Sequence, residues 1–92
     1  MRLAIDDVKG VKGKDLVMSI IRLRECYIME NCTKPTKVKM SCATFNRIRK
    51  FADDYDLLLC KWNDFTDEME YRLCWLDVVF DDDMKGVEVC DV

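Results

Sequence analysis

The stretch TKVKMSCATFNRIRKFADDY, residues 36–55, contains a strand pattern and a helix pattern in direct succession. Within residues 36–40, the apolar Val38 and Met40 alternate with lysines, which predicts a half-buried strand. Ser41 predicts the N-cap of a helix, because its hydroxyl can accept a hydrogen bond from a free amide of the first turn. Apolar residues spaced three and four apart then predict an amphipathic helix, with a buried stripe of Phe45, Ile48, Ala52 and Tyr55.

A longer helix is predicted before this stretch, from Asp15 to about Asn31. Its apolar residues recur at steps of three and four, and Pro35 lies beyond its end as a helix breaker. The stripe consists of Leu16, Ile20, Leu23 and Tyr27, widened by Val17, Ile21 and Ile28. Residues 1–13 contain two Val-Lys-Gly triplets and are predicted to form a mobile N-terminal segment that leads into the helix.

The chain beyond Asp56 has the patterns of strands. Residues 57–62 form an apolar run of strand length, which could instead prolong the preceding helix. Turn-forming residues at 63–68 and 81–86 separate this run from two further predicted strands, at 70–80 and 87–92. Within residues 70–80, Tyr71, Leu73 and Trp75 are predicted to share one face of the sheet.

These elements predict an α+β fold in the order α-β-α-β-β-β. Two helices pack on a small, mostly antiparallel sheet of about four strands. The length of 92 residues suits a single domain over residues 1–92.

Composition narrows the classes of function. Half of the residues are apolar and 36% are charged, as in globular proteins. The apolar runs are too short for a membrane span or a signal peptide, so we expect a cytoplasmic protein without membrane contact. The chain has no histidine, which is the commonest general base and metal ligand. We therefore expect neither an enzyme nor a cofactor or metal site.

Six cysteines lack the paired C-x-x-C spacing of zinc sites: Cys26, Cys32, Cys42, Cys60, Cys74 and Cys90. Four of them have apolar neighbours, which predicts reduced thiols in the core: Cys26, Cys60, Cys74 and Cys90. A disulfide and a bound metal are the alternatives.

The charge is divided unequally along the chain. Residues 1–50 have a net charge of +7, and residues 51–92 have a net charge of −10. If the two halves pack as separate faces, the surface is dipolar and steers a charged partner. The alternative is that the halves attract each other and their charges largely cancel.

Two segments resemble parts of phage proteins. Residues 34–41 (KPTKVKMS), followed by Thr44-Phe45 and Ile48, resemble a strand that leads into a helix, and residues 75–84 (WLDVVFDDDM) resemble its companion. Such segments occur in the peripheral domain of HK97-like major capsid proteins and in small standalone phage proteins. The family often has glycine where this chain has Trp75 and proline where it has Lys85. The resemblance covers residues 34–92 and implies viral or prophage origin, with no functional residue carried over.

Ten carboxylates beside predicted turns and helix ends suggest an acidic contact surface. Such a surface can occupy a positively charged nucleic-acid channel of another protein, as anti-CRISPR inhibitors often do. We therefore expect a non-enzymatic phage protein that binds and modulates or inhibits a host or defence protein in the host cytosol. Ordinary solubility charge is the alternative for these residues, which are Asp53, Asp54, Asp56, Asp64, Asp67, Glu68, Glu70, Asp81, Asp82 and Asp83.

Two other functions stay open. One is a virion structural or assembly component, which would form a homo-oligomer. The other is a nucleic-acid-binding module that uses the basic half of the chain. An isoelectric point near 4.9 argues against this second function. Its candidate residues are Lys37, Lys39, Arg47, Arg49 and Lys50.

Two acidic clusters have a second interpretation. Residues 81–83 could bind Mg²⁺ or Ca²⁺, because hard cations prefer carboxylate oxygens. Glu68 and Glu70 could act as a general acid and base pair. A solvated turn and a solvated face are the favoured interpretations of these two clusters.

Overall fold

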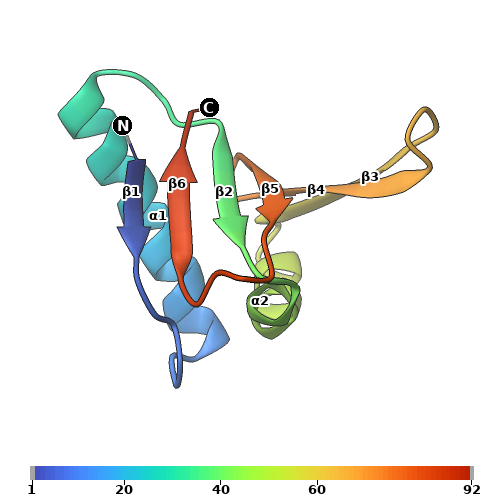
Figure 1. The fold of residues 1–92 in the computed structure, drawn as a ribbon, viewed down its shortest axis with the longest axis horizontal. Coiled ribbons are helices and arrows are strands. Elements are labelled where there is room, and N and C mark those ends of the chain that lie inside the picture. The colour runs from blue at the N-terminus through green and yellow to red at the C-terminus, as the bar shows by residue number, and fades with distance from the viewer. Residues whose placement is uncertain (1, 92) are drawn as a thin grey trace.

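The computed structural model describes residues 2–91, in which six strands and two helices form an α+β fold (Figure 1). The elements are β1 (Arg2–Ile5), α1 (Gly13–Asn31), β2 (Lys37–Met40), α2 (Cys42–Asp54), β3 (Leu58–Asn63), β4 (Glu68–Leu73), β5 (Leu76–Phe80) and β6 (Val87–Cys90). One sheet contains all the strands in the order β1-β6-β2-β5-β4-β3. Strands β2 and β5 are parallel, and the other neighbours are antiparallel.

The α+β class and both helices are confirmed, but the prediction of about four strands is wrong. Residues 2–5 form an additional edge strand, β1, which pairs with β6. The apolar stretch in β1 is too short to be distinguished from a loop by pattern alone. The second additional strand arises because residues 70–80 form two strands instead of one.

The break between β4 and β5 is a turn of two residues, Cys74 and Trp75. Their φ angles are 51° and 67°, and the flanking Leu73 and Leu76 are paired. Two consecutive positive φ angles characterise type I′ hairpin turns, which strongly prefer Asn-Gly. Neither cysteine nor tryptophan is typical of such turns, so the pattern of residues 70–80 predicted one continuous strand. The prediction that Trp75 shares a strand face with Tyr71 and Leu73 is therefore wrong, because Trp75 lies in the turn.

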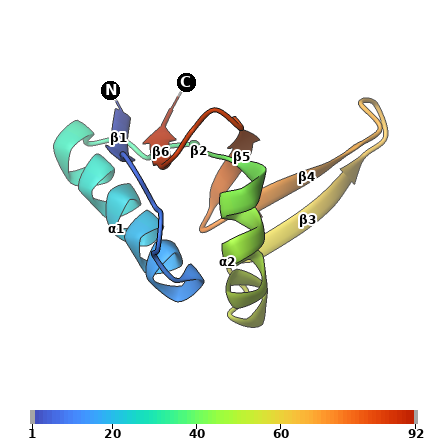
Figure 2. The same cartoon turned by 60° about the horizontal axis from the view of Figure 1, so that its bottom comes forward.

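Both helices cover the same face of the sheet (Figure 2). The predicted stripe of α1 is buried at Leu16, Val17, Ile20 and Tyr27, and that of α2 at Phe45, Ile48 and Ala52. Tyr55 differs from the prediction: it is the C-cap of α2 and is exposed. The Ser41 hydroxyl accepts a hydrogen bond from the Thr44 amide at 3.1 Å, which confirms the predicted N-cap. Residues 58–63 are a strand and do not prolong α2.

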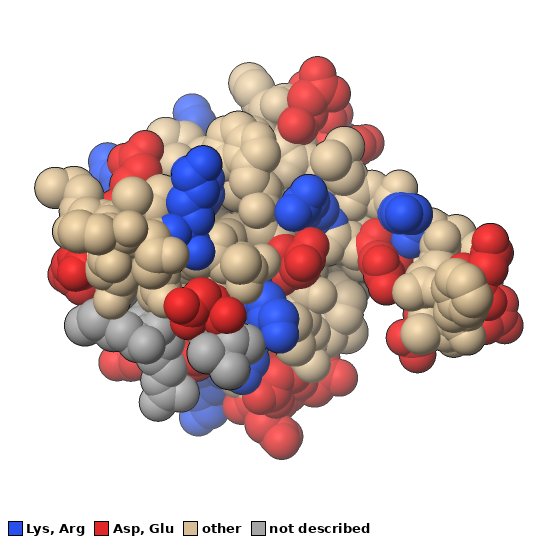
Figure 3. All heavy atoms as spheres, turned by 90° about the horizontal axis from the view of Figure 1, so that it is seen from above, with Lys and Arg blue, Asp and Glu red and all other residues tan. Residues whose placement is uncertain are grey.

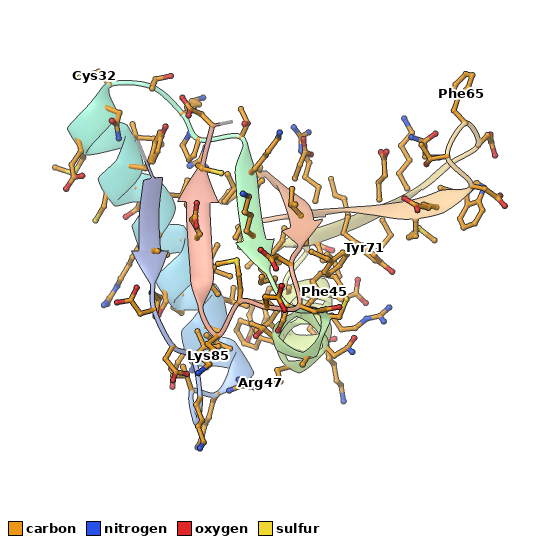
Figure 4. The ribbon with its side chains drawn as sticks, in the orientation of Figure 1. Cys32, Phe45, Arg47, Phe65, Tyr71 and Lys85 are labelled. Carbon is orange, nitrogen blue, oxygen red and sulfur yellow. The ribbon has the colours of Figure 1, made fainter. Side chains whose placement is uncertain are left out.

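The segment between β1 and α1 has specific anchors. Val8 is buried, and its amide donates a hydrogen bond to the Lys85 carbonyl at 3.0 Å. The Arg47 guanidinium, on α2, donates to the carbonyls of Val8, at 3.1 Å, and Val11. Figure 4 shows Arg47 and Lys85 beside this segment. The predicted mobile segment therefore includes a strand and a loop that is hydrogen-bonded to both α2 and the β5–β6 connection.

The basic and acidic halves of the chain interleave in the sheet. Strand β2, from the basic half, lies between β6 and β5, which come from the acidic half. The strands of the two halves are therefore mixed within one sheet and do not form two separate layers. On the face that Figure 3 shows, Lys and Arg side chains are interspersed with Asp and Glu side chains.

Among residues 2–91, neither helix is long and apolar enough to cross a membrane.

The left-handed turn predicts an unusual order of stability for two variants of Trp75. Both Trp75→Gly and Trp75→Ala remove the indole ring, including its contact with the Arg24 guanidinium, 5.3 Å from the ring centroid. Inside an ordinary strand, the glycine variant would be less stable by roughly 0.5–1 kcal/mol. At a φ of 67° we expect the glycine variant to be the more stable, by about 1 kcal/mol, because it has no Cβ to strain the turn.

Thermal and urea unfolding of the two purified variants measure this difference. For a domain of this size, 1 kcal/mol corresponds to roughly 4–8 °C in Tm. A higher Tm for Trp75→Ala would show that residues 70–80 form a continuous strand.

Candidate functional site

Strands β3 and β4 form a hairpin that projects from the body of the molecule (Figures 1 and 2). We call this hairpin, residues 58–73, the arm. Its strands are paired along their whole length, from Leu58↔Leu73 to Asn63↔Glu68. Strand β4 pairs with β5 only at Arg72↔Asp77 and Leu73↔Leu76. The outer half of the arm is therefore a two-stranded ribbon with no further strand of residues 2–91 beside it.

The tip of the arm is closed by local hydrogen bonds. The Asn63 side-chain oxygen accepts from the Phe65 amide at 2.9 Å, and its amide nitrogen donates to the Glu70 carboxylate at 2.6 Å. Asp67 takes up the positive φ, 57°, that the turn requires. This geometry leaves the Phe65 ring fully exposed, at 101% of its reference area, at the end of the arm (Figure 4).

The two faces of the arm differ in polarity. Directly opposed residues of antiparallel strands share a face, so the pairs Trp62↔Met69 and Cys60↔Tyr71 line one side. The opposite side carries one apolar residue, Leu59, and five polar residues: Lys61, Asn63, Glu68, Glu70 and Arg72. At the outer end of the apolar side, Trp62 is 49% exposed and Met69 is 43% exposed. The arm is thus an amphipathic ribbon whose apolar face is largely uncovered toward its tip.

Three aromatic rings fix the base of the arm. The centroid of Phe45, on α2, lies 4.7 Å from that of Tyr71 on β4 and 5.3 Å from that of Phe80 on β5. The Tyr71 and Phe80 centroids are 6.0 Å apart, and both pairs that include Phe80 are edge-to-face. Each such pair contributes roughly 0.5–1.5 kcal/mol beyond burial. Figure 4 shows Phe45 and Tyr71 side by side where the arm leaves the body.

The ten predicted acidic residues form three groups on different elements. Asp53 and Asp54 end α2, with Asp56 just after it, and residues 81–83 lie in the turn after β5. The remaining four are on the arm: Asp64, Asp67, Glu68 and Glu70. This last group lies on the same element as the uncovered apolar face, with Glu68 and Glu70 on the opposite side of the arm.

Two carboxylates of the group at 81–83 are engaged within the fold. Asp82 accepts a hydrogen bond from the Cys42 amide, at the start of α2, at 3.0 Å. Asp81 accepts from the Asp83 amide at 3.1 Å. A carboxylate at a helix N-terminus is favourable because it satisfies a free amide and opposes the helix dipole. These contacts indicate a structural role for Asp81 and Asp82.

The structure does not bring the five predicted nucleic-acid-binding residues together. Lys37 and Lys39 alternate with the buried Val38 and Met40, so they project from the sheet face that the helices leave uncovered. The other three, Arg47, Arg49 and Lys50, are on α2, which covers the opposite face. The Arg47 guanidinium is also occupied by two loop carbonyls.

The cysteines divide by exposure. Cys74 and Cys90 are buried, as predicted, but Cys26 and Cys60 are exposed, so their assignment to the core is wrong. Cys26 lies on α1 away from the sheet, and Cys60 lies on the arm, where little of the chain covers it. Cys32 and Cys42 are exposed as well. No disulfide joins the six cysteines. Within residues 2–91, no three His, Cys, Asp or Glu side chains are placed so that they could hold a metal ion together.

The residues that make the arm distinctive were not among the predicted site residues. Trp62 was assigned to a strand and Phe65 to a turn, and Met69 lay between the predicted turn and the next predicted strand. Phe65, in the middle of an acidic turn, could have indicated a contact residue, because turns exposed to solvent consist mainly of small and polar residues.

Comparison of the chain with models of protein families, with curated proteins and with solved structures finds no match. The resemblance to segments of phage capsid proteins therefore stays a prediction.

Thiol alkylation is predicted to distinguish the exposed cysteines from Cys74. Burial raises the pKa of the Cys74 thiol to about 11, so almost none of it is thiolate near pH 8. We expect iodoacetamide to modify Cys26, Cys32 and Cys60 more than about a hundredfold faster than Cys74 in the native protein. Peptide mapping by mass spectrometry over time measures these rates, with the urea-unfolded protein as control. Equal native rates for Cys60 and Cys74 would contradict the buried turn.

Proposed function

We propose that this protein acts by binding another protein, and that the arm is its contact surface. The observation that carries the proposal is the apolar face of the arm, on which Trp62 and Met69 are half-exposed and beyond which Phe65 is fully exposed. Contiguous apolar surface on a small protein commonly marks an interaction site. Tryptophan and other aromatic residues are also enriched where interfaces gain most of their binding energy.

The geometry of the arm supports the same proposal. A two-stranded ribbon is only marginally stable in water, and it gains stability when its apolar face packs against another layer. Here α2 supplies that layer only at the base, through the contact between Phe45 and Tyr71. A partner that covers Trp62, Met69 and Phe65 would complete the second layer at the outer end.

The charge of the arm defines the partner further. Four carboxylates lie on the outer half of the arm: Asp64 and Asp67 in the turn at its tip, and Glu68 and Glu70 on the face opposite Trp62 and Met69. Complementary potentials accelerate encounter and select partners. The fitting partner therefore has an apolar pocket with a basic rim, such as the nucleic-acid-binding surface of another protein. Occupying such a surface would inhibit that protein by exclusion alone, which agrees with the inhibitor expected from the sequence.

A double substitution at the tip of the arm tests this proposal. We expect Trp62→Ala/Phe65→Ala to weaken binding by about a thousandfold or more, since two residues of this kind contribute at least ~2 kcal/mol each. Met29→Ala, at a site on α1 that is 82% exposed, is the matched control and should bind like the wild type. The partner is first captured from an extract of the source cells on the immobilised wild-type protein. Surface plasmon resonance with the purified partner then measures all three affinities.

Measurements of folding and of salt dependence complete the test. Circular dichroism and thermal unfolding of the three proteins should agree, because the substituted side chains are not in the core. Raising the salt concentration should slow association, as expected for an acidic contact surface. Unchanged affinity of the double variant would exclude the arm as the contact surface.

A further inference from the structure

A hollow separates β4 from β5 where the two strands diverge. We call it the notch; its volume is about 400 Å³, within the range of ligand pockets. Four consecutive residues from each strand line it: Glu68, Met69, Glu70, Tyr71, Asp77, Val78, Val79 and Phe80. Consecutive residues of a strand point to opposite faces of a sheet. A hollow lined by both sets therefore lies between the edges of the two strands and not over one face.

The backbone of β5 presents hydrogen-bonding groups to the notch. On its other side, the Asp77 amide donates to the Thr36 carbonyl at 2.9 Å and the Asp81 amide donates to the Met40 carbonyl at 2.9 Å. Backbone groups of successive strand residues point to opposite edges. Val78 and Phe80, which have the other parity, therefore direct their N–H and C=O groups away from β2 and into the notch.

The backbone of β4 does the same from the other wall. The Cys74 amide donates to the Leu57 carbonyl at 2.8 Å, which sets the phase of the ladder between β3 and β4. Hydrogen-bonded pairs alternate in an antiparallel ladder, so Arg72 and Glu70 bond to β3. Tyr71 and Met69 consequently direct their N–H and C=O groups into the notch. In a regular hairpin Tyr71 would pair with Val78, but the pairing ends at Arg72↔Asp77.

The side chains around the notch differ between the two faces of the sheet. Val78 and Phe80 pair in register with the buried Val38 and Met40, so they lie on the helix-covered face, together with Tyr71 and Met69. The uncovered face carries three carboxylates of the notch: Glu68, Glu70 and Asp77. Asp77 pairs with the Arg72 guanidinium at 3.5 Å, so Glu68 and Glu70 contribute most of the negative charge.

We propose that the notch binds an extended, basic segment of the partner protein, which adds a strand beside β5. Added strands gain affinity from main-chain hydrogen bonds and specificity from alternate side chains. The segment would place apolar residues toward Tyr71 and Phe80 and lysine or arginine residues toward Glu68 and Glu70. This inference rests on the proposed protein-binding function and names the chemistry of the partner.

A synthetic peptide tests the notch without the natural partner. The probe is an acetylated, amidated eight-residue peptide of alternating valine and lysine, titrated into ¹⁵N-labelled protein. We expect saturable shifts at the amides of Val78 and Phe80, and slower hydrogen exchange at these two amides. A second peptide with N-methyl groups on alternate residues cannot complete the ladder and should lose binding, as should a valine–glutamate peptide.

Two matched variants separate the notch from general acidity. Glu68→Gln/Glu70→Gln should weaken the peptide by about tenfold or more, through the loss of two charge contacts. Asp53→Asn/Asp54→Asn removes the same charge at the end of α2 and should bind like the wild type. Equal weakening by both variants, or equal binding of the N-methylated peptide, would overturn the inference, as would the absence of shifts at millimolar peptide. Concentration-dependent shifts at Val78 and Phe80 without peptide would identify a second copy of the chain as the occupant and would also overturn it.

The failure of this inference is distinguishable from the failure of the proposed function. If the peptide does not bind while Trp62→Ala/Phe65→Ala still abolishes capture of the partner, the arm is the contact surface and the notch is not. If the peptide binds while the double variant captures the partner normally, the notch is a binding site and the outer end of the arm is not.

Discussion

The turn at Cys74 and Trp75 is the constraint on which the distinctive part of this molecule depends. Their positive φ angles reverse the chain within residues 70–80, whose sequence pattern predicts a single strand. After the turn, β5 pairs with β2 in the body of the sheet. Before the turn, β4 pairs with β3 in the arm. Left-handed conformations are unfavourable for residues with side chains, by roughly 1–2 kcal/mol each. The turn is held in place by the burial of Cys74 itself and of Leu73 and Leu76 on either side of it.

The divergence of β4 from β5 produces both candidate binding features at once. It exposes the apolar face of the arm, and it leaves backbone groups of both strands facing the notch. The Phe45 ring anchors both strands to α2 at this point, so the divergence is part of the packed structure. Exposed strand edges promote aggregation unless charged residues protect them. The carboxylates on the arm can serve this purpose while they also select a basic partner.

Local patterns predicted the parts of the fold in which sequence neighbours decide the structure. The apolar stripe of α1, the Ser41 cap and the alternation in β2 depend on residues within one or two turns of the chain. The turn at Cys74 escaped prediction because packing overrides the preference of its residues. The same limit applies to the charged sites. The ten carboxylates were grouped because they lie beside predicted turns and helix ends, and the five basic residues because they lie on a strand and the helix that follows it. The fold distributes both sets over different elements and faces.

The sequence alone determined the α+β class, both helices, the strands at β2 and β6, and the acidity of the second half of the chain; it left residues 57–62 open between a strand and an extension of the preceding helix. These features follow from periodicity, capping and composition, which are properties of short segments. Only the tertiary structure decided the strand order, the interleaving of the two halves, and the exposure of Trp62 and Phe65 on a projecting arm. Strand order and exposure depend on contacts between residues far apart in the chain. A segment's own pattern does not encode whether another layer will cover it.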